Sequence, residues 1–412
     1  MSNDASATVS GPLTGVRVLD LSRILAGPTC TQLLGDLGAE IYKIERLGAG
    51  DDTRKWGPPF VKDSDGKDTA ESAYYLCANR NKKSVAVDIS KPDGAEVVRQ
   101  MAKQCDILIE NFKLGGLKAY GLSYDDLKDS HPELVYCSIT GFGQTGPNRD
   151  KPGYDVMAQG YGGIMSLTGE PEGHPTKVAV GIADVMCGMY ASTAILAALR
   201  HRDKTGEGQH IDLALVDSQI AWLINEGTNY LTSGQEPIRR GNAHPNIVPY
   251  QTFETADGHV IIAVGNDSQF QRFCKVIGRQ DLAADPRYET NTQRITARDT
   301  LVPEVADAVS RMTKDDLLSA LASEKVPAGP VNTLEQVFAS DQVAARDMKI
   351  SMPHASSGAG TVDLIGNPIK LSKTPVTYRH APPVCGADTD DVVGTLLGHD
   401  ALERAKAKGV VG

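Results

Sequence analysis

The sequence predicts an α/β fold built on a parallel sheet. Strand-like and helix-like segments alternate from residue 15 onward, and the alternation recurs to about residue 140. A polar stretch punctuated by Gly and Pro at 225–246 then indicates that a second, smaller domain follows. Alternation of this kind is typical of a sheet with helices on its faces, and ligands of such sheets bind outside the carboxyl ends of the strands.

The first β-α-β unit spans residues 15–48. Apolar residues at 16–21 indicate a strand, and Ala26-Gly27-Pro28 begins a helix, since Pro suits the first helical turn. Helical spacing of apolar residues continues to Leu37, and the next strand follows. Further strands are expected at 84–89, 106–110, 134–140 and 209–213, and helices at 93–103, 124–130 and 184–200.

The domain organisation is predicted from these changes in sequence pattern and composition. Residues 1–224 are expected to form the N-terminal part of a large Rossmann-like domain, 225–246 a linker, 247–345 a small α+β domain, and 346–412 a return to the large domain. Within the small domain, Ala256-Asp257-Gly258 between two strand-like runs predicts a hairpin.

Composition restricts the classes of partner. The chain has 42 basic and 52 acidic residues, a formal net charge of −10, which argues against a nucleic-acid-binding surface. We expect no apolar run to reach the length of a membrane span, and residues 1–16 resemble neither a secretory signal nor a mitochondrial presequence, so the prediction is a cytoplasmic protein that binds no membrane. Seven scattered cysteines without C-x-x-C indicate neither a disulfide framework nor a metal site.

Familiar catalytic and nucleotide motifs are absent from the sequence. The turn after the first strand reads Ser22-Arg23-Ile24-Leu25-Ala26-Gly27-Pro28 rather than G-x-G-x-x-G, which argues against a NAD-dependent dehydrogenase. The chain also lacks a Walker A sequence, H-E-x-x-H and G-x-S-x-G. Candidate chemistry therefore depends on acidic residues in unusual surroundings and on a scattered set of cations.

Asp184 stands between small and apolar residues at the start of a predicted helix. One interpretation is an N-cap. The other is a nucleophile, which the helix N-terminus would keep ionised and which Gly181, Ala183 and Gly188 would leave open to a bulky substrate. Asp155, which follows Tyr154, presents the same choice.

Basic residues form the second candidate set. They follow predicted strand or turn positions: Arg46, Arg54, Arg80, Lys82 and Lys83. Together they could gather around the phosphates of a ligand. Taken singly, each is better interpreted as part of a solvated face.

Several segments together resemble the class III (CaiB/BaiF-type) coenzyme A transferases, over about residues 12–400. They are Pro12–Pro28, 34–40, Lys43-Ile44-Glu45-Arg46, 50–54, Asn79–Ser84, Glu110-Asn111-Phe112, Gly181-Ile182-Ala183-Asp184 and 204–209. Within this family, Arg240–Gln251 is similar to the branch that acts on succinyl-CoA and short dicarboxylic acids such as glutarate.

This resemblance implies an enzyme that moves CoA from a donor such as succinyl-CoA to a small carboxylic acid. The catalytic aspartate of the family falls on Asp184, and Tyr154 and Asp155 match an adjacent Tyr–acid pair. The carboxylate would form a mixed anhydride with the acyl group, and the returning CoA thiolate would convert it to an aspartyl-CoA thioester. Coenzyme A and its esters are then substrates, and no permanently bound cofactor is implied.

The resemblance also implies binding residues. CoA would be contacted by Arg23, Ile24, Leu25, Ala26, Arg46, Arg80, Lys82, Asn111 and Phe112, and the acyl group or acid by Trp56, Tyr74, Asn242 and His244. His244 is equally consistent with a structural loop residue. Leu25 replaces a glutamine of the formyl-CoA enzyme, and 241–245 is not the family's glycine run, so oxalate is not the expected acid.

Three other functions stay open from the sequence, and a formyl-CoA:oxalate-type transferase is the first. The family also contains α-methylacyl-CoA racemases, but their catalytic histidine falls on Tyr154 here, which argues against proton abstraction by a His–Asp pair. A non-catalytic CoA-ester-binding protein would not need Asp184. The resemblance further implies an interlocked homodimer.

Overall fold

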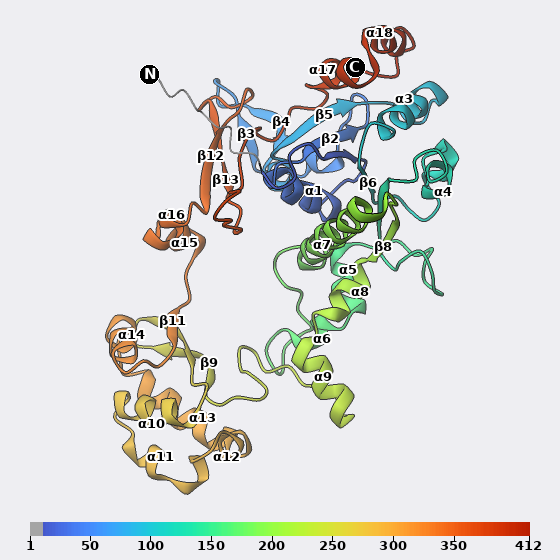
Figure 1. Ribbon diagram of the computed structural model, residues 1–412. Helices are drawn as coiled ribbons and strands as arrows, with labels where there is room; N and C mark the ends of the chain where they lie inside the picture. The colour runs from blue at the N-terminus through green and yellow to red at the C-terminus, as the bar shows by residue number, and fades with distance from the viewer. Residues whose placement is uncertain (1–10) are drawn as a thin grey trace, which may run out of the picture. The chain divides into compact units, whose positions relative to one another are not determined.

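The computed structural model describes residues 11–412, which form two compact units (Figure 1). The first unit contains the chain up to Gly163, Val178–Trp222 and Gln342–Gly412. The second contains Ile164–Lys177 and Leu223–Asp341. The second unit is therefore built from two insertions into the first.

A six-stranded sheet forms the centre of the first unit, and every pairing in it is parallel. The strand order is β5-β2-β1-β6-β7-β8. The chain moves outward from β1 in one direction and then returns to the other side of β1 with β6, so the topological switch lies between these two strands. The bounds are β1 Arg17–Asp20, β2 Glu40–Glu45, β5 Lys82–Ala86, β6 Ile107–Glu110, β7 Val135–Thr140 and β8 His210–Ala214.

Helices cover both faces of this sheet (Figure 1). Alternate strand residues face opposite sides, so Val18 and Ile107 pack under α1 and α7, whereas Leu19 and Leu108 pack under α3, α17 and α18. The strands are apolar throughout because both faces are buried. The helices are α1 Ala26–Asp36, α3 Pro92–Ala102, α7 Ile182–Thr205, α8 Leu215–Ala221, α17 Thr389–Leu397 and α18 His399–Ala407.

Helix α7 corrects one sequence prediction. By length and composition alone it is apolar enough to cross a membrane. However, 56% of its most apolar window is buried, and it packs closely against α1, with Cys187, Ala191 and Ile195 in the core. The helix is thus a core element of the first unit.

Smaller elements complete the first unit. Two antiparallel hairpins, β3–β4 and β12–β13, accompany short helices. The bounds are β3 Phe60–Lys62, β4 Asp68–Ser72, β12 Lys349–Pro353, β13 Thr361–Ile365, α2 Ala73–Leu76, α4 Tyr124–Leu127, α5 Asp155–Tyr161, α16 Asp341–Ala345, η1 Asp52–Lys55 and η2 Lys118–Tyr120.

The second unit packs helices on a three-stranded antiparallel sheet of order β11-β10-β9. The predicted hairpin is confirmed, since Thr255 pairs with Gly258 across the Ala256-Asp257 turn. The core includes Phe270, Phe273 and Leu301. The bounds are β9 Tyr250–Thr255, β10 Gly258–Ala263, β11 Ala328–Pro330, α6 Ile164–Leu167, α9 Ile224–Ser233, α10 Asp267–Val276, α11 Gln280–Ala284, η3 Pro286–Tyr288, α12 Asn291–Thr296, α13 Arg298–Val309, α14 Lys314–Ser323 and α15 Leu334–Ala339.

The segment 225–246 is not the simple linker that its composition indicated. Most of α9 lies in it, and the rest packs on the first insertion, where the Gly241 N–H donates to the Gly169 carbonyl at 3.0 Å and Arg239 Nη2 to the Gly173 carbonyl at 2.6 Å. The insertion at 164–177 was not predicted, because its contacts are with residues about seventy positions later in the chain.

Candidate active site

A cavity of about 430 Å³ opens at the carboxyl ends of the strands around the topological switch. The turn after β1, the segment after β6 and the segment after β7 all contribute to its wall, as does the start of α7. This is where a doubly wound sheet binds its ligands. The lining residues that matter below are Arg23, Ile24, Leu25, Ala26, Asn111, Phe112, Arg149, Lys151, Tyr154 and Asp184.

Asp184 is the third residue of α7, whose N-cap is Gly181, so the N-cap interpretation of this aspartate is wrong. Its side chain lies at the cavity but only 9% of the residue is exposed. Burial, and after it the charge of Asp155, raises the pKa of Asp184 to about 7. Desolvation of the carboxylate acts against the helix N-terminus, which was expected to keep it ionised.

Asp155 is the first residue of α5, but its carboxylate accepts hydrogen bonds from the start of α7. Its Oδ1 accepts from the Ala183 N–H at 2.8 Å and from the Asp184 N–H at 3.4 Å, and its Oδ2 accepts from Gln159 Nε2 at 2.7 Å. These bonds satisfy donors that the first turn of a helix leaves unpaired. Asp155 thus fixes the start of α7 and places a second charge beside Asp184.

Three aromatic residues were predicted near Asp184: Tyr154, Trp56 and Tyr74. Tyr154 lines the cavity and is 60% exposed. The Trp56 and Tyr74 rings meet edge to face with centroids 5.1 Å apart. Burial, followed by the charge of Asp184, raises the pKa of Tyr74 to about 12, so this phenol lies within electrostatic reach of Asp184.

The space beside the glycines near Asp184 is occupied by other parts of the protein. A Cβ on Gly181 would lie 3.0 Å from Leu25 Cδ2, and one on Gly188 would lie 2.6 Å from the Ala26 carbonyl oxygen. Leu25 and the start of α1 fill that space, so the expectation that Gly181 and Gly188 admit a bulky substrate is wrong. Their role is to let α1 approach α7 closely.

A second cavity, of about 260 Å³, shares Arg23 and Phe112 with the first. The Arg23 guanidinium lies 5.5 Å from the centre of the Phe112 ring and pairs with Asp52 at 3.0 Å. Arg46 pairs with the same carboxylate at 2.8 Å and lines the second cavity. Two exposed cations therefore border an apolar recess that also includes Ile89, Ser90 and Tyr120.

Arg80 and Lys82 line neither of these cavities, and their contact with CoA stays a prediction. Arg80 is buried in a bidentate pair with Asp36. Lys82 begins β5 at the amino end of a parallel strand, and its buried Nζ donates to the Pro28 carbonyl at 3.0 Å and approaches Asp20 at 3.3 Å. Each of the two cations thus neutralises a buried carboxylate of the protein.

The remaining basic candidates, Arg54 and Lys83, are also engaged by the protein. Arg54 is buried between Glu45 and Glu71 and lies over the Tyr75 ring, 3.7 Å from its centre. Lys83 pairs with Asp391 at 2.8 Å. Of the predicted cluster, Arg46 alone lines either of the two cavities.

Asn111 lines the first cavity, yet both ends of its amide are bound to the Arg23 backbone. Its Oδ1 accepts from the Arg23 N–H at 2.8 Å and its Nδ2 donates to the Arg23 carbonyl at 2.7 Å. The amide thus holds the turn after β1 rather than projecting freely into the cavity.

Two cations at the cavity were missed from the sequence. Arg149 and Lys151 belong to the long connection after β7, and Arg149 pairs with Asp150 at 3.7 Å. Their position after the carboxyl end of a predicted parallel strand was the signal that could have identified them.

Asn242 and His244 belong to the second unit, where their contacts are local. Asn242 Nδ2 donates to Thr252 Oγ1 at 3.0 Å. His244 Nδ1 accepts from the Asn246 N–H at 3.0 Å, and its ring lies 5.1 Å from that of Tyr250. These contacts suit a structural loop residue, and binding of the acid by Asn242 and His244 stays a prediction.

Comparison with known proteins decides the family. The model of CoA-transferase family III matches residues 13–389. The chain belongs to this family. It is an enzyme of the class III CoA-transferases, which use acyl-CoA as substrate.

Relatives of this CoA-transferase cover almost its whole length. A succinate–glutarate CoA-transferase of Agrobacterium fabrum is 47% identical over 393 residues, 95% of this chain and 97% of that protein. A succinyl-CoA:glutarate CoA-transferase of Homo sapiens is 40% identical over 402 residues, 97% of this chain and 90% of that protein. A crystal structure of a CaiB/BaiF family protein from Brucella suis has a TM-score of 0.83 and 46% identity, covering 94% of this chain and 100% of that one.

Proposed function

We propose that this CoA-transferase moves CoA from succinyl-CoA to a short dicarboxylate such as glutarate, through covalent intermediates on Asp184. One observation carries the proposal: Asp184 is a buried carboxylate at the cavity wall, and within residues 11–412 no hydrogen-bond donor or cation engages it. A buried charge is normally paired. An unpaired one whose pKa lies near neutrality is suited to nucleophilic attack.

The proposed reaction passes through two kinds of adduct. An oxygen of Asp184 attacks the thioester carbon of succinyl-CoA, the C–S bond breaks, and CoA leaves as a thiolate. The thiolate then attacks the Asp184 carbonyl carbon of the mixed anhydride, which releases succinate and leaves an aspartyl-CoA thioester. A carboxylate of glutarate displaces the thiolate from this thioester. The thiolate finally attacks the glutaryl carbon, which gives glutaryl-CoA and frees Asp184.

Burial of Asp184 suits this sequence of steps. An anhydride hydrolyses if water reaches it, so a nucleophile that is only 9% exposed protects its own intermediates. The elevated pKa also means that the ionised form is poorly solvated and strongly nucleophilic. No proton need be transferred in any step, which is consistent with a centre that lacks a histidine among the cavity-lining residues described.

The surrounding groups are proposed to bind the long CoA chain. Arg23, Arg149 and Lys151 at the first cavity and Arg46 at the second would neutralise phosphates. The apolar recess beside Phe112 would take the adenine, and the turn at 23–26 would run along the pantetheine arm. We propose Trp56 and Tyr74 as neighbours of the acyl group.

Two further proposals concern assembly and location. Large apolar side chains are exposed on α7 and α8, including Met189, Tyr190, Ile220 and Trp222, which would suit burial in a homodimer. The interlocked form of that dimer is proposed from the family resemblance. A cytoplasmic location is proposed from the sequence.

A transfer assay tests the proposed function. Purified protein is incubated with succinyl-CoA and a panel of mono- and dicarboxylic acids, and new acyl-CoA esters are identified by mass spectrometry. We expect glutaryl-CoA with the native protein and none with Asp184→Ala. Asp203→Ala, an exposed aspartate near the other end of α7, is the matched control and should retain activity. Failure of every acid to yield an ester would refute the proposal.

A further inference from the structure

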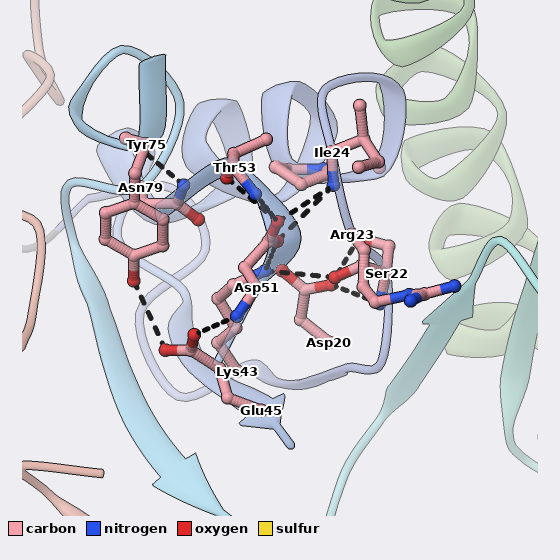
Figure 2. Close-up of polar contacts among 12 residues, drawn as sticks. Asp20, Ser22, Arg23, Ile24, Lys43, Glu45, Asp51, Thr53, Tyr75 and Asn79 are labelled. Carbon is pink, nitrogen blue, oxygen red and sulfur yellow. Dashed lines mark hydrogen bonds and ion pairs between the residues drawn. The ribbon is translucent and has the colours of Figure 1, made fainter. Parts of the chain in front are cut away.

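The turn between β1 and α1 is held by side chains at each backbone polar group from the Ser22 N–H to the Ile24 N–H. Figure 2 shows Asp20, Lys43 and Asp51 around this turn. A turn needs far fewer such contacts to form. The partners in order are Asp20 on the Ser22 N–H (2.9 Å), Lys43 Nζ on the Ser22 carbonyl (3.0 Å), Asn111 on the Arg23 N–H and carbonyl (2.8 and 2.7 Å), and Asp51 on the Ile24 N–H (3.3 and 3.4 Å).

Ile24 has a backbone conformation that its side chain disfavours. Its φ is +71°, in the left-handed region. A β-branched residue there is an outlier, because its Cβ crowds the neighbouring carbonyl and strains the backbone. Such a conformation persists only where the surrounding structure over-determines it. The run of contacts from 22 to 24 supplies that constraint.

Asp51 is the charged part of the constraint. Its carboxylate is buried and accepts from Lys43 Nζ at 2.9 Å and from the Thr53 N–H and Oγ1 at 3.0 and 2.8 Å, besides Ile24. Burial acts to raise its pKa, but Lys43 and Thr53 outweigh burial and lower it to about 2. Lys43, which also binds the Ser22 carbonyl, is itself fully buried, so the two charges join opposite ends of the turn (Figure 2).

The turn ends at the catalytic cavity. Leu25 and Ala26 follow Ile24 in the cavity wall, and the Leu25 side chain packs against Gly181, the N-cap of the helix that carries Asp184. A change of φ at Ile24 would swing this wall away from its present place. Residue 24 thus directly precedes the Leu25–Ala26 part of the cavity wall in front of Asp184.

We infer that Asp51 is a positioning residue for CoA transfer: with Lys43 it holds the left-handed turn at Ile24 and so the Leu25–Ala26 wall that CoA meets. The competing view is that Asp51 merely neutralises Lys43 and caps η1 through Thr53. The two views differ in one respect. Only the first makes the importance of Asp51 depend on which residue occupies position 24.

Glycine at position 24 distinguishes the positioning role of Asp51 from the competing view, because glycine adopts a positive φ without cost. CoA binding is measured by calorimetry for the native protein, Asp51→Asn, Ile24→Gly and the double variant. We expect Asp51→Asn to weaken CoA binding about tenfold with Ile24 present. In the Ile24→Gly background the loss should be less than about threefold, because glycine relieves the backbone strain at residue 24 that Asp51 otherwise holds. The control is Asp36→Asn. Asp36 is also a buried carboxylate, paired with Arg80, and its substitution should destabilise the fold without changing CoA affinity.

An equal loss of affinity in both backgrounds, or the same loss in Asp36→Asn, would overturn the inference. If Asp51→Asn does not fold, Asp51→Glu, which keeps the charge but displaces the carboxylate, is measured in the same two backgrounds with the same expectation. The kinetic meaning of the inference rests on the proposed function, whereas calorimetry reads CoA binding directly. A protein that binds CoA with this coupling but transfers none would refute the proposed function alone.

Discussion

Replacing Asp155 by Asn should shift the pH dependence of CoA transfer to lower pH. In the native site, burial and then the charge of Asp155 raise the pKa of Asp184 from 3.8 to about 7. The amide of the variant retains an oxygen that can accept from the Ala183 N–H, a bond of 2.8 Å in the native structure, but it removes the negative charge. The change therefore alters the electrostatics of Asp184 while the helix end remains held.

The size of the shift follows from the order of the two causes. The whole rise in the pKa is about 3, and burial contributes more of it than Asp155 does. We therefore expect the midpoint of the profile to fall by no more than about 1.5 pH units in Asp155→Asn. Only ionised Asp184 attacks, so kcat/KM should rise with pH through the pKa of the free enzyme.

The assay compares kcat/KM for succinyl-CoA between about pH 5.5 and about pH 9 in the two proteins at constant ionic strength. Titration of the CoA phosphates affects both profiles equally and cancels in the comparison. A midpoint that does not move, with a lower rate at every pH, would refute the electrostatic role and leave Asp155 only its role at the start of α7.

Three further predictions concern stability and binding. Asp184→Asn should stabilise the fold at about pH 8 by up to about 4 kcal/mol, and by less as the pH falls to about 5. Folding raises the pKa of Asp184, so the contribution of this carboxyl group to stability is lost as the pH rises from the unfolded pKa of 3.8 through about 7. Urea unfolding of both proteins at the two pH values measures this, and an equal difference in unfolding free energy at both values would contradict it. Arg46→Ala should raise KM for the CoA ester about tenfold with kcat unchanged. Arg80→Ala should instead cost about 3–5 kcal/mol of stability, because Asp36 is left buried without its partner; an altered KM in folded Arg80→Ala would support contact of Arg80 with CoA. Removing Arg149 and Lys151 together should raise KM and weaken its dependence on salt, and an unchanged KM would exclude the loop after β7 from binding.

Much of the first unit could be predicted because its sequence signals are local. The strands are short apolar runs, and Pro28 and Gly38 mark the start and end of α1. Alternation of these elements was enough to place a ligand site at the carboxyl edge of the sheet, where Arg23 and Asn111 are found.

The division into units was harder to predict because it depends on distant contacts. Residues 164–177 join the second unit through partners such as Gly241 and Arg239. Nothing in the composition of this short segment distinguishes it from the loops before it. A helix such as α9 inside a polar stretch was likewise hidden by its Gly and Asn content.

The surroundings of the charged residues could not be predicted, for a physical reason. Arg80 and Lys82 carry the same charge as Arg46, and sequence alone does not tell a cation that faces solvent from one that neutralises a buried carboxylate. The acids that bury them, Asp36 and Asp20, lie more than forty positions away in the chain. Only the fold brings these charges together.

Tracing oxygen from the acceptor acid tests most directly the claim that CoA passes through Asp184. Glutarate labelled with heavy oxygen in its carboxylates is turned over with succinyl-CoA, and the released succinate is examined by mass spectrometry. In the proposed sequence a labelled oxygen remains on Asp184 after glutaryl-CoA forms, and the next turnover transfers it to succinate. We expect heavy oxygen in succinate; glutaryl-CoA formed without label in succinate would refute passage of CoA through Asp184.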